Sequence, residues 1–400
     1  ISSWFNGLSD CRPGATEIPT DSHQMDTFYA DPFVRQRLVE YLGGDSLDSA
    51  SAVYVTHSDG CLFQRSELHP PLDLQWFLDR NLDIARSLAD RKSLLLHLDL
   101  EYVHFDSPGE AYRDPARAFG LQEPVVKVIE TLLLEWGIEP LHMITGQGHH
   151  FVWRVGVDSE VALKIAALMP SAELVAACMD RVGEGIDIND AQQISFSGLA
   201  LMMEYLAHRI KWVAAPHAEV PVEITAVHVG PCGTHMREMI SVDVSEYGDP
   251  LHTRMVRMPY THYLKPWLSG LAKDIGLEGD LPRFRAIPLH EMDVQQALVC
   301  RTDEGCVKDL ARRATARIPL QEEGTAKMLA EYMGSPLQRF HRKFYSVEHH
   351  PKQTWAETYD TLPLASLPPC VGILLEHPND RLLKPAGMQL VTRALLAEGW

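Results

Sequence analysis

Two acidic residues, Asp99 and Glu101, interrupt a leucine-rich segment that covers residues 92–102. Because side chains alternate along a strand, His97, Asp99 and Glu101 are expected on one face and the leucines at positions 94, 96, 98 and 100 on the other. Buried carboxylates need a compensating charge, and Mg²⁺ and Mn²⁺ prefer oxygen ligands. The segment therefore predicts a core strand that carries a divalent-metal site. The alternative is a strand end whose acids are merely solvated.

Residues 141–157 predict a β-hairpin. A short apolar strand at 141–145 is followed by the break Gly146-Gln147-Gly148, and a second strand begins at His149. In this second strand, alternation groups His150 with Val152 and Arg154, and it groups His149 with the large apolar side chains. The aromatic face is expected in the core. His149 is therefore expected to be structural, and His150 to point away from the core.

A third acid is expected on a strand at residues 239–245. Alternation places Asp243 on the polar face of that strand, opposite its apolar side chains. The basic segment RMPYTHYLK follows at residues 257–265.

The remaining pattern predicts an α/β (α+β) core followed by a mostly helical C-terminal part. Helices are expected at residues 32–42 and 159–169, with Asp31 and Ser159 as their capping residues, and at 72–89. Further helices are expected to end at Trp136 before Gly137, within 186–213 and near 387–398. A strand is expected at 51–56 and a polar loop at 106–119. The expected domains are an N-terminal helical segment (1–50), a catalytic domain (51–288) and a helical C-terminal domain (289–400).

Composition narrows the class of protein. With 400 residues and 46% hydrophobic content, the chain is long enough for two or three domains with sizeable cores. A net charge of −18 argues against a generally basic nucleic-acid coat, although a local basic groove remains compatible with it. No apolar run approaches a membrane span and the first residues lack a signal-peptide core, so a cytoplasmic protein that contacts no membrane is expected.

The cysteines predict reduced thiols rather than a disulfide framework, because there are 7 of them, scattered over a long chain. Two alternatives are zinc sites formed by Cys300 and Cys306 after His290, or by Cys232 and His235. Neither set supplies four ligands at a standard spacing, so free thiols are favoured.

Taken together, the acid pair on a strand, the turn from Thr145 to His150 and a later strand aspartate resemble the three motifs of the archaeo-eukaryotic primase (primase-polymerase) superfamily. The resemblance covers about residues 50–290. It implies that Asp99, Glu101 and Asp243 are catalytic and bind metal. It also implies a set of nucleotide-binding residues: Thr145, Gly146, Gly148, His150, Arg257, Thr261 and Lys265.

The basic segment resembles the R-x-P-x-S-x-H-x-K segment of small catalytic primase subunits, which implies that Arg257 lies near the nucleotide phosphates. Thr261 replaces the usual serine and Tyr263 the usual histidine, and Glu101 stands where many members have aspartate.

The resemblance implies an RNA-recognition-like sheet joined to an N-terminal α/β unit, with the site in the cleft between them. The implied activity is template-directed nucleotidyl transfer with two Mg²⁺ or Mn²⁺ ions. The implied partners are a single-stranded DNA template, a primer and nucleoside triphosphates, and a prokaryotic protein of this kind would be nucleoid-associated.

The C-terminal stretch resembles the opening of the iron–sulfur domain of large primase subunits, through residues 367–370 and 377–400. Cys370 is the single cysteine after position 306, so the sequence as given does not supply the four thiolates of a cluster.

Two alternatives remain open from the sequence. One is a non-catalytic nucleic-acid-binding primase subunit, against which the intact set of acids argues. The other is a metal-dependent nuclease or replication initiator; such initiators usually carry His-x-His and a tyrosine nucleophile, and the adjacent His149 and His150 do not fit that pattern.

Overall fold

The computed structural model of the chain describes residues 28–59, 68–168, 190–227, 229–231, 235–248, 251, 254–345, 367–376 and 385–397. These residues form a mixed α/β fold with two β-sheets, as the sequence predicts at that level. The chain divides into two compact units, one up to Tyr345 and one from Ser346. The domain boundary that the sequence predicts after residue 288 therefore lies within the first unit.

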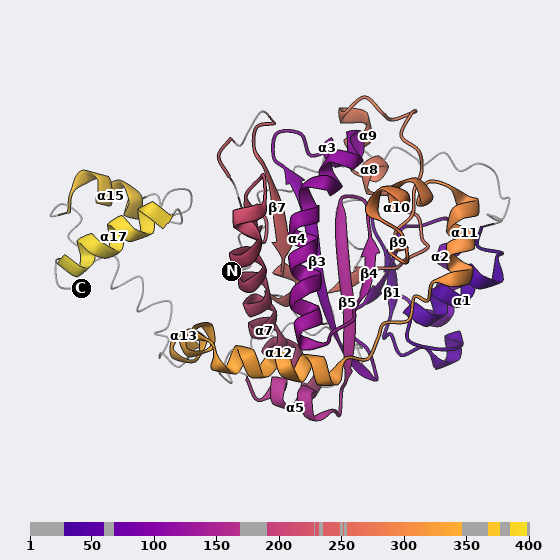
Figure 1. Cartoon of the computed structure of the whole chain (residues 1–400), viewed down its shortest axis with the longest axis horizontal. Coiled ribbons are helices and arrows are strands. Elements are labelled where there is room, and N and C mark those ends of the chain that lie inside the picture. The colour runs from indigo at the N-terminus through magenta and orange to yellow at the C-terminus, as the bar shows by residue number, and fades with distance from the viewer. Residues whose placement is uncertain are drawn as a thin grey trace. The chain divides into compact units, whose positions relative to one another are not determined.

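The larger sheet has six strands and carries the acidic residues (Figure 1). Its strands, in spatial order, are β6 (Val222–Ile224), β7 (Glu238–Asp243), β3 (Ser93–His104), β5 (Gly148–Gly156), β4 (Leu141–Ile144) and β9 (Ile287–Pro288). Neighbouring strands are antiparallel, except that β6 and β7 are parallel. The long strand β3 lies inside the sheet, and β4 and β5 form the hairpin that the sequence predicts.

Helices cover one face of this sheet, and Figure 1 shows α4 (Pro115–Trp136) and α7 (Asp190–Ala214) in front of its strands. The even-numbered leucines of β3 are buried, and so are Phe151 and Trp153 of β5. The indole Nε1 of Trp153 donates to Thr325 Oγ1 on α12 (Glu322–Gly334) at 3.2 Å. The apolar face of the hairpin is therefore in the core, as alternation predicts.

The polar loop expected at 106–119 is wrong in part, because two helices begin inside it. These are α3 (Glu110–Arg113) and α4, whose N-cap Asp114 accepts a hydrogen bond from Arg117 N at 3.0 Å. Pro115 occupies the first turn of α4, where a missing N–H costs nothing. Gly137 ends α4 at a φ of 76°, a left-handed conformation that favours glycine.

The smaller sheet consists of three antiparallel strands, β1 (Val55–His57), β2 (Ile84–Ser87) and β8 (Met255–Arg257), with β2 in the middle. The helix expected at 72–89 is therefore wrong. Only η3 (Pro71–Asp73) and α2 (Leu74–Leu78) occupy its beginning. Every residue of β2 is buried, so pairing with two neighbouring strands overrides the local helical pattern.

The remaining elements of the first unit surround the two sheets. Two expected helix starts are confirmed by their caps, since Asp31 accepts from Phe33 N before α1 and Ser159 accepts from Ala162 N before α5. The elements not yet named are α1 (Pro32–Tyr41), η2 (Leu47–Ser49), α5 (Glu160–Ala166), η4 (Ala215–His217), η5 (Ser245–Gly248), α8 (Lys265–Leu268), α9 (Leu271–Asp274), α10 (Val294–Cys300), α11 (Glu304–Arg313) and α13 (Pro336–Tyr345).

The second unit contains α15 (Pro369–Glu376) and α17 (Pro385–Ala397), whose contact is apolar and includes Val371, Leu375 and Val391. The final helix expected from the sequence is thus present. Cys370 is an exposed free thiol. Within the described segments, no helix is long and apolar enough to cross a membrane.

Cys300 and Cys306 form a disulfide that joins the end of α10 to the first turn of α11. The expectation of reduced thiols is therefore wrong for this pair, and the same bond removes both sulfurs from the zinc alternative with His290. Sequence spacing did not reveal the pairing because the turn between the two helices is what brings the sulfurs together. Cys232, from the second zinc alternative, lies outside the described residues.

Candidate functional site

The six-stranded sheet brings Asp99 and Asp243 together, although the two residues are far apart in the sequence. Asp99 of β3 is paired directly with Asp243 of β7 on one side and with His150 of β5 on the other. Residues directly opposite each other on neighbouring strands point to the same face, with Cβ atoms about 5 Å apart. Glu101, two residues along β3, shares this face and lies opposite Gly148 and Ser241.

Asp99 is an unusual carboxylate because its Oδ1 is buried and accepts no hydrogen bond. Nε2 of His150 lies 3.5 Å from that oxygen, and the side chain of Asp99 is 21% exposed. Burial, followed by the like charges of Glu101, Asp243 and Glu246, raises the pKa of Asp99 well above its usual value, and Lys265 opposes this effect. Such a group is destabilised when ionised, so a cation at this place would stabilise it.

Asp243 differs because its carboxylate is hydrogen-bonded. Its Oδ1 accepts from Ser245 N at 2.8 Å and from Thr225 Oγ1 at 3.2 Å. Throughout the described ranges, no three His, Cys, Asp or Glu side chains are arranged to hold one metal ion. The acids therefore share one face and one stretch of sheet, and coordination of a common ion would require their side chains to rotate. The unpartnered oxygen and the concentration of negative charge fit a divalent cation.

The two adjacent histidines occupy opposite faces of β5, as alternation predicts. His149 is buried under α4, where its ring contacts Phe119 and its Nδ1 lies 2.9 Å from Nε2 of His142. His150 faces the acids and its buried Nδ1 has no hydrogen-bond partner. Burial, and then electrostatic interaction with His97 and Arg257, lower the pKa of His150 well below its usual value, so its imidazole is neutral at pH 7.

The turn between β4 and β5 is tightly packed. Thr145 Oγ1 donates to the carbonyl of Gly148 at 3.2 Å. A Cβ at Gly146 would overlap the ring of Tyr263, and one at Gly148 would overlap the carbonyl oxygen of Leu100. Both positions therefore require glycine because protein atoms fill the adjacent space.

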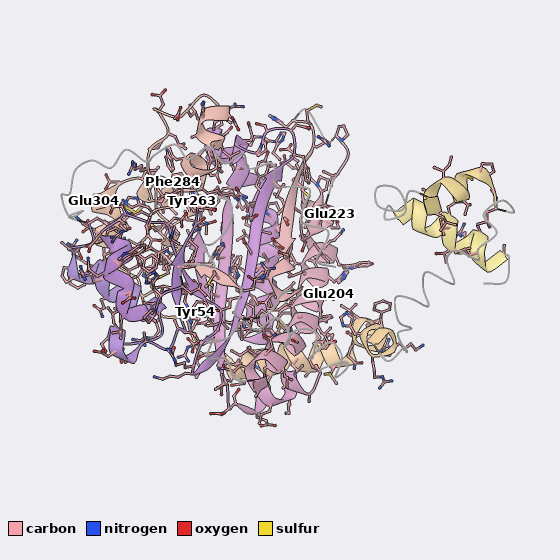
Figure 2. The ribbon with its side chains drawn as sticks, turned by 180° about the vertical axis from the view of Figure 1, so that it is seen from behind. Tyr54, Glu204, Glu223, Tyr263, Phe284 and Glu304 are labelled. Atoms are coloured by element: carbon pink, nitrogen blue, oxygen red, sulfur yellow. A yellow bond between two sulfur atoms is a disulfide. The ribbon has the colours of Figure 1, made fainter. Side chains whose placement is uncertain are left out.

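Tyr263, which follows His262 in the basic segment, is part of an aromatic cluster over this turn. Its ring stacks on Phe284 with centroids 5.4 Å apart, and its hydroxyl lies 3.3 Å from that of Tyr112. In Figure 2, Tyr263 and Phe284 are labelled next to each other beside the upper part of the large sheet.

Arg301 supports the same turn from the C-terminal part of the first unit. Its guanidinium donates to the carbonyl of Thr145 and lies 3.5 Å from that of Gly146. Burial lowers the pKa of Arg301 to about 10. Sequence reasoning missed this residue because nothing near position 301 resembles the motifs it supports.

The basic segment contributes two cations with different surroundings. Arg257 ends β8, forms a buried ion pair with Asp83 and lies over the Tyr263 ring at 4.3 Å. Lys265 begins α8, and its Nζ lies 3.5 Å from Gln147 Oε1. Burial opposes the charge of Lys265, but the neighbouring Tyr263, Glu101 and Asp99 raise its pKa.

Thr261 has a local role. It is fully buried and its Oγ1 donates to the carbonyl of Met258 at 2.8 Å, which holds the turn after β8. Of the three residues taken from the basic segment, Arg257 and Thr261 thus have protein partners, and Lys265 is the one whose pKa the acids Glu101 and Asp99 raise.

Glu246 and His97 belong to the site, and the motifs did not include them. Nδ1 of His97 lies 2.8 Å from Glu246 Oε2, and its buried Nε2 has no hydrogen-bond partner. The rings of His97 and His150 are 4.6 Å apart. Alternation had placed His97 on the acidic face, but the contact with Glu246 depends on how the turn after β7 folds back.

Comparisons of the chain with protein-family models, with curated proteins and with solved structures gave no match. The resemblance to primase-polymerases therefore rests on the sequence motifs.

Proposed function

We propose that the protein is a primase-polymerase that carries out template-directed nucleotidyl transfer. The observation that carries the proposal is the direct pairing of Asp99 with Asp243 in the interior of the sheet, with His150 on the other side of Asp99. Three acids and a neutral histidine on one sheet face, approached by Lys265, match the residue types that this chemistry needs.

The fold that we propose for this core is an RNA-recognition-like sheet joined to an N-terminal α/β unit. Two features support it: a mainly antiparallel sheet with helices α4 and α7 on one face, and a separate three-stranded sheet whose β8 carries Arg257. The proposed site lies on the face away from α4.

In the proposed reaction the 3′-hydroxyl oxygen of a primer bonds to the α-phosphorus of a nucleoside triphosphate, the bond from that phosphorus to pyrophosphate breaks, and the hydroxyl proton is released to water. Asp99, Glu101 and Asp243 would hold Mg²⁺ or Mn²⁺, which supplies neutralisation of the phosphate charge and a more acidic attacking hydroxyl. Lys265 would bind phosphate oxygens as a point charge. His150, whose ring faces Asp99, would donate a hydrogen bond to a phosphate oxygen.

Arg257 has a positioning role in this proposal. Its ion pair with Asp83 and its stacking on Tyr263 connect β8 to the turn that carries Gly146. It would therefore act on the nucleotide through the shape of the site.

The test is incorporation of labelled nucleotides on a single-stranded DNA template, with and without a primer, in Mg²⁺ or Mn²⁺. We expect Asp99→Asn and Asp243→Asn to lower kcat/KM by at least about 100-fold, which corresponds to about 2.7 kcal/mol of transition-state stabilisation. The matched control is Glu223→Gln on β6, which removes one carboxylate from the edge of the same sheet. It should keep full activity.

Two outcomes would replace the proposal. If wild type incorporates no nucleotide, while the Asp99→Asn, Asp243→Asn double variant binds single-stranded DNA as well as wild type, the chain is a binding subunit. If wild type cuts the template and the double variant does not, the same acids serve a metal-dependent nuclease.

A further inference from the structure

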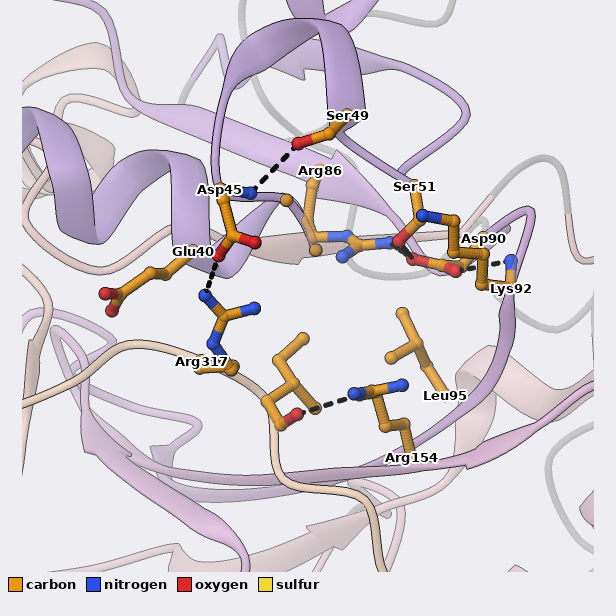
Figure 3. A pocket seen from close by; sticks show the side chains of 13 residues that line it. Glu40, Asp45, Ser49, Ser51, Arg86, Asp90, Lys92, Leu95, Arg154 and Arg317 are labelled. Atoms are coloured by element: carbon orange, nitrogen blue, oxygen red, sulfur yellow. Dashed lines mark hydrogen bonds and ion pairs between the residues drawn. The ribbon is translucent and has the colours of Figure 1, made fainter.

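A pocket of about 240 Å³ opens near the first residues of β3 (Figure 3). Leu95 and Arg154, which are cross-strand partners, line it from the same sheet face as Asp99. Leu95 is four residues from Asp99, about 13 Å along the strand, so the pocket is separate from the acidic site. Its volume is below the about 300 Å³ at which pockets for drug-sized ligands begin, so it suits a small group.

The pocket has a surplus of positive charge. Each lining carboxylate has an internal cation: Asp90 pairs with Arg86 at 2.8 Å, Asp45 with Arg317 at 2.5 Å and Glu40 with Arg37 at 2.6 Å. In Figure 3, Arg86 lies beside Asp90 and Arg317 beside Asp45. Two cationic lining residues, Lys92 and Arg154, have no carboxylate partner among the described residues.

Arg154 is held in a fixed orientation. Its Nε donates to the carbonyl of Ile318 at 2.9 Å and its Nη1 to Ser93 Oγ at 3.0 Å. A guanidinium anchored through one edge keeps its remaining N–H groups aligned for an oxyanion. Lys92 is exposed, so its ammonium is free to move toward a bound anion.

We propose that this pocket binds a phosphate-sized oxyanion, held by Arg154 and Lys92. The two unpaired cations match the one to two negative charges of a phosphate group. Two sources share this chemistry: free inorganic phosphate, and a phosphate group of a nucleic-acid strand. The site does not depend on the proposed polymerase activity, because none of the three acids lines it.

The first experiment measures inorganic phosphate binding to the full chain by isothermal titration calorimetry at constant ionic strength, with chloride as the balancing anion. We expect saturable binding to wild type, at least about 10-fold weaker binding to Lys92→Gln and weaker still to Lys92→Glu, since one charge-assisted contact is lost and then reversed. Arg154→Lys keeps the positive charge but removes the planar guanidinium with its parallel N–H donors, so it should also weaken phosphate binding.

Two controls separate the pocket from general charge effects. Lys127→Gln removes one exposed lysine on α4, which covers the opposite face of the sheet, and should bind phosphate as wild type does. Asp99→Asn should also bind phosphate normally, whether or not it incorporates nucleotides, so failure of one proposal is distinguishable from failure of the other. Because Lys92 is exposed and forms no ion pair in the described structure, its variants should fold even if Arg154→Lys does not.

The second experiment identifies the source of the anion. Fluorescence anisotropy measures binding of a single-stranded oligonucleotide in the presence of increasing phosphate. Competition by phosphate, together with weaker DNA binding by Lys92→Glu, assigns the pocket to a nucleic-acid phosphate. Phosphate binding without competition assigns it to the free anion. The proposal is overturned if wild type binds phosphate no better than chloride, or if Lys92→Glu binds phosphate as tightly as wild type.

Discussion

Asp90 comes just before β3 and Asp99 lies in the middle of this strand, and the two carboxylates have opposite electrostatic surroundings. Asp90 accepts hydrogen bonds from Arg86, Ser51 and the backbone of Lys92 and Ser93. Burial alone would raise its pKa, but the charge and hydrogen bond of Arg86, with the other donors, lower it. Asp99 has an unpartnered buried oxygen and acidic neighbours, and its pKa is raised.

The difference separates a structural carboxylate from a candidate functional one. A carboxylate whose partners are all internal needs nothing else, so Asp90 stabilises the fold directly. A carboxylate that is repelled by neighbouring like charges is stabilised when a ligand supplies a cation. Groups whose pKa is shifted in this way are common at functional sites. On this reasoning a ligand is expected beside Asp99 and Glu101 of β3.

The largest difference between the two carboxylates should appear when each is replaced by asparagine. Asp90→Asn leaves Arg86, which is 1% exposed, without a counter-charge, and should lower the free energy of unfolding by about 3–5 kcal/mol. Asp99→Asn relieves repulsion and should leave the free energy of unfolding unchanged or raise it. Urea denaturation in EDTA measures both. Equal losses in the two variants would mean that Asp99 is a structural residue like Asp90.

A smaller effect should come from divalent cations. Mn²⁺ at about 100 times its dissociation constant should raise the free energy of unfolding of wild type by about 2.7 kcal/mol, because it binds only the folded acids. Asp99→Asn should lose most of this increase, and Glu223→Gln should keep it. Thermal unfolding with and without Mn²⁺ is the measurement. An identical Mn²⁺ response in wild type and Asp99→Asn would place the ion elsewhere.

The smallest effect should be the change in the free energy of unfolding with pH. This change has opposite signs for the two residues. The folded pKa of Asp90 lies below its unfolded value of about 3.9, so its contribution is present above that pH and is lost as the pH falls through the folded pKa. The folded pKa of Asp99 lies above the unfolded value, so its ionisation lowers stability as the pH rises from about 4 through the folded pKa.

The contribution of each carboxylate is the free energy of unfolding of wild type minus that of the matching asparagine variant. Without divalent ions, the stability of wild type relative to Asp99→Asn should fall with rising pH, by no more than about 1.4 kcal/mol per pH unit for a single proton. Relative to Asp90→Asn it should fall with decreasing pH. Urea denaturation at a series of pH values gives both slopes, and a flat difference for Asp99→Asn would contradict the repulsion seen at this site.

The sequence by itself determined the elements whose signals are local. Alternation in β3 and β5 separated Asp99 and Glu101 from the leucines and His150 from His149, since backbone geometry forces neighbouring side chains to opposite faces. Capping residues and Gly137 likewise marked helix ends, because they satisfy backbone groups within a few residues.

Only the tertiary structure decided which distant residues meet. Residues 84–87 have a helical pattern, yet they form the middle strand of a sheet, because pairing on both edges outweighs a weak local preference. The partners of the predicted site residues, Glu246 for His97, Asp83 for Arg257 and Arg301 for the Thr145 turn, follow no sequence spacing. They depend on strand register and on how loops pack, which are properties of the whole fold and not of any short segment.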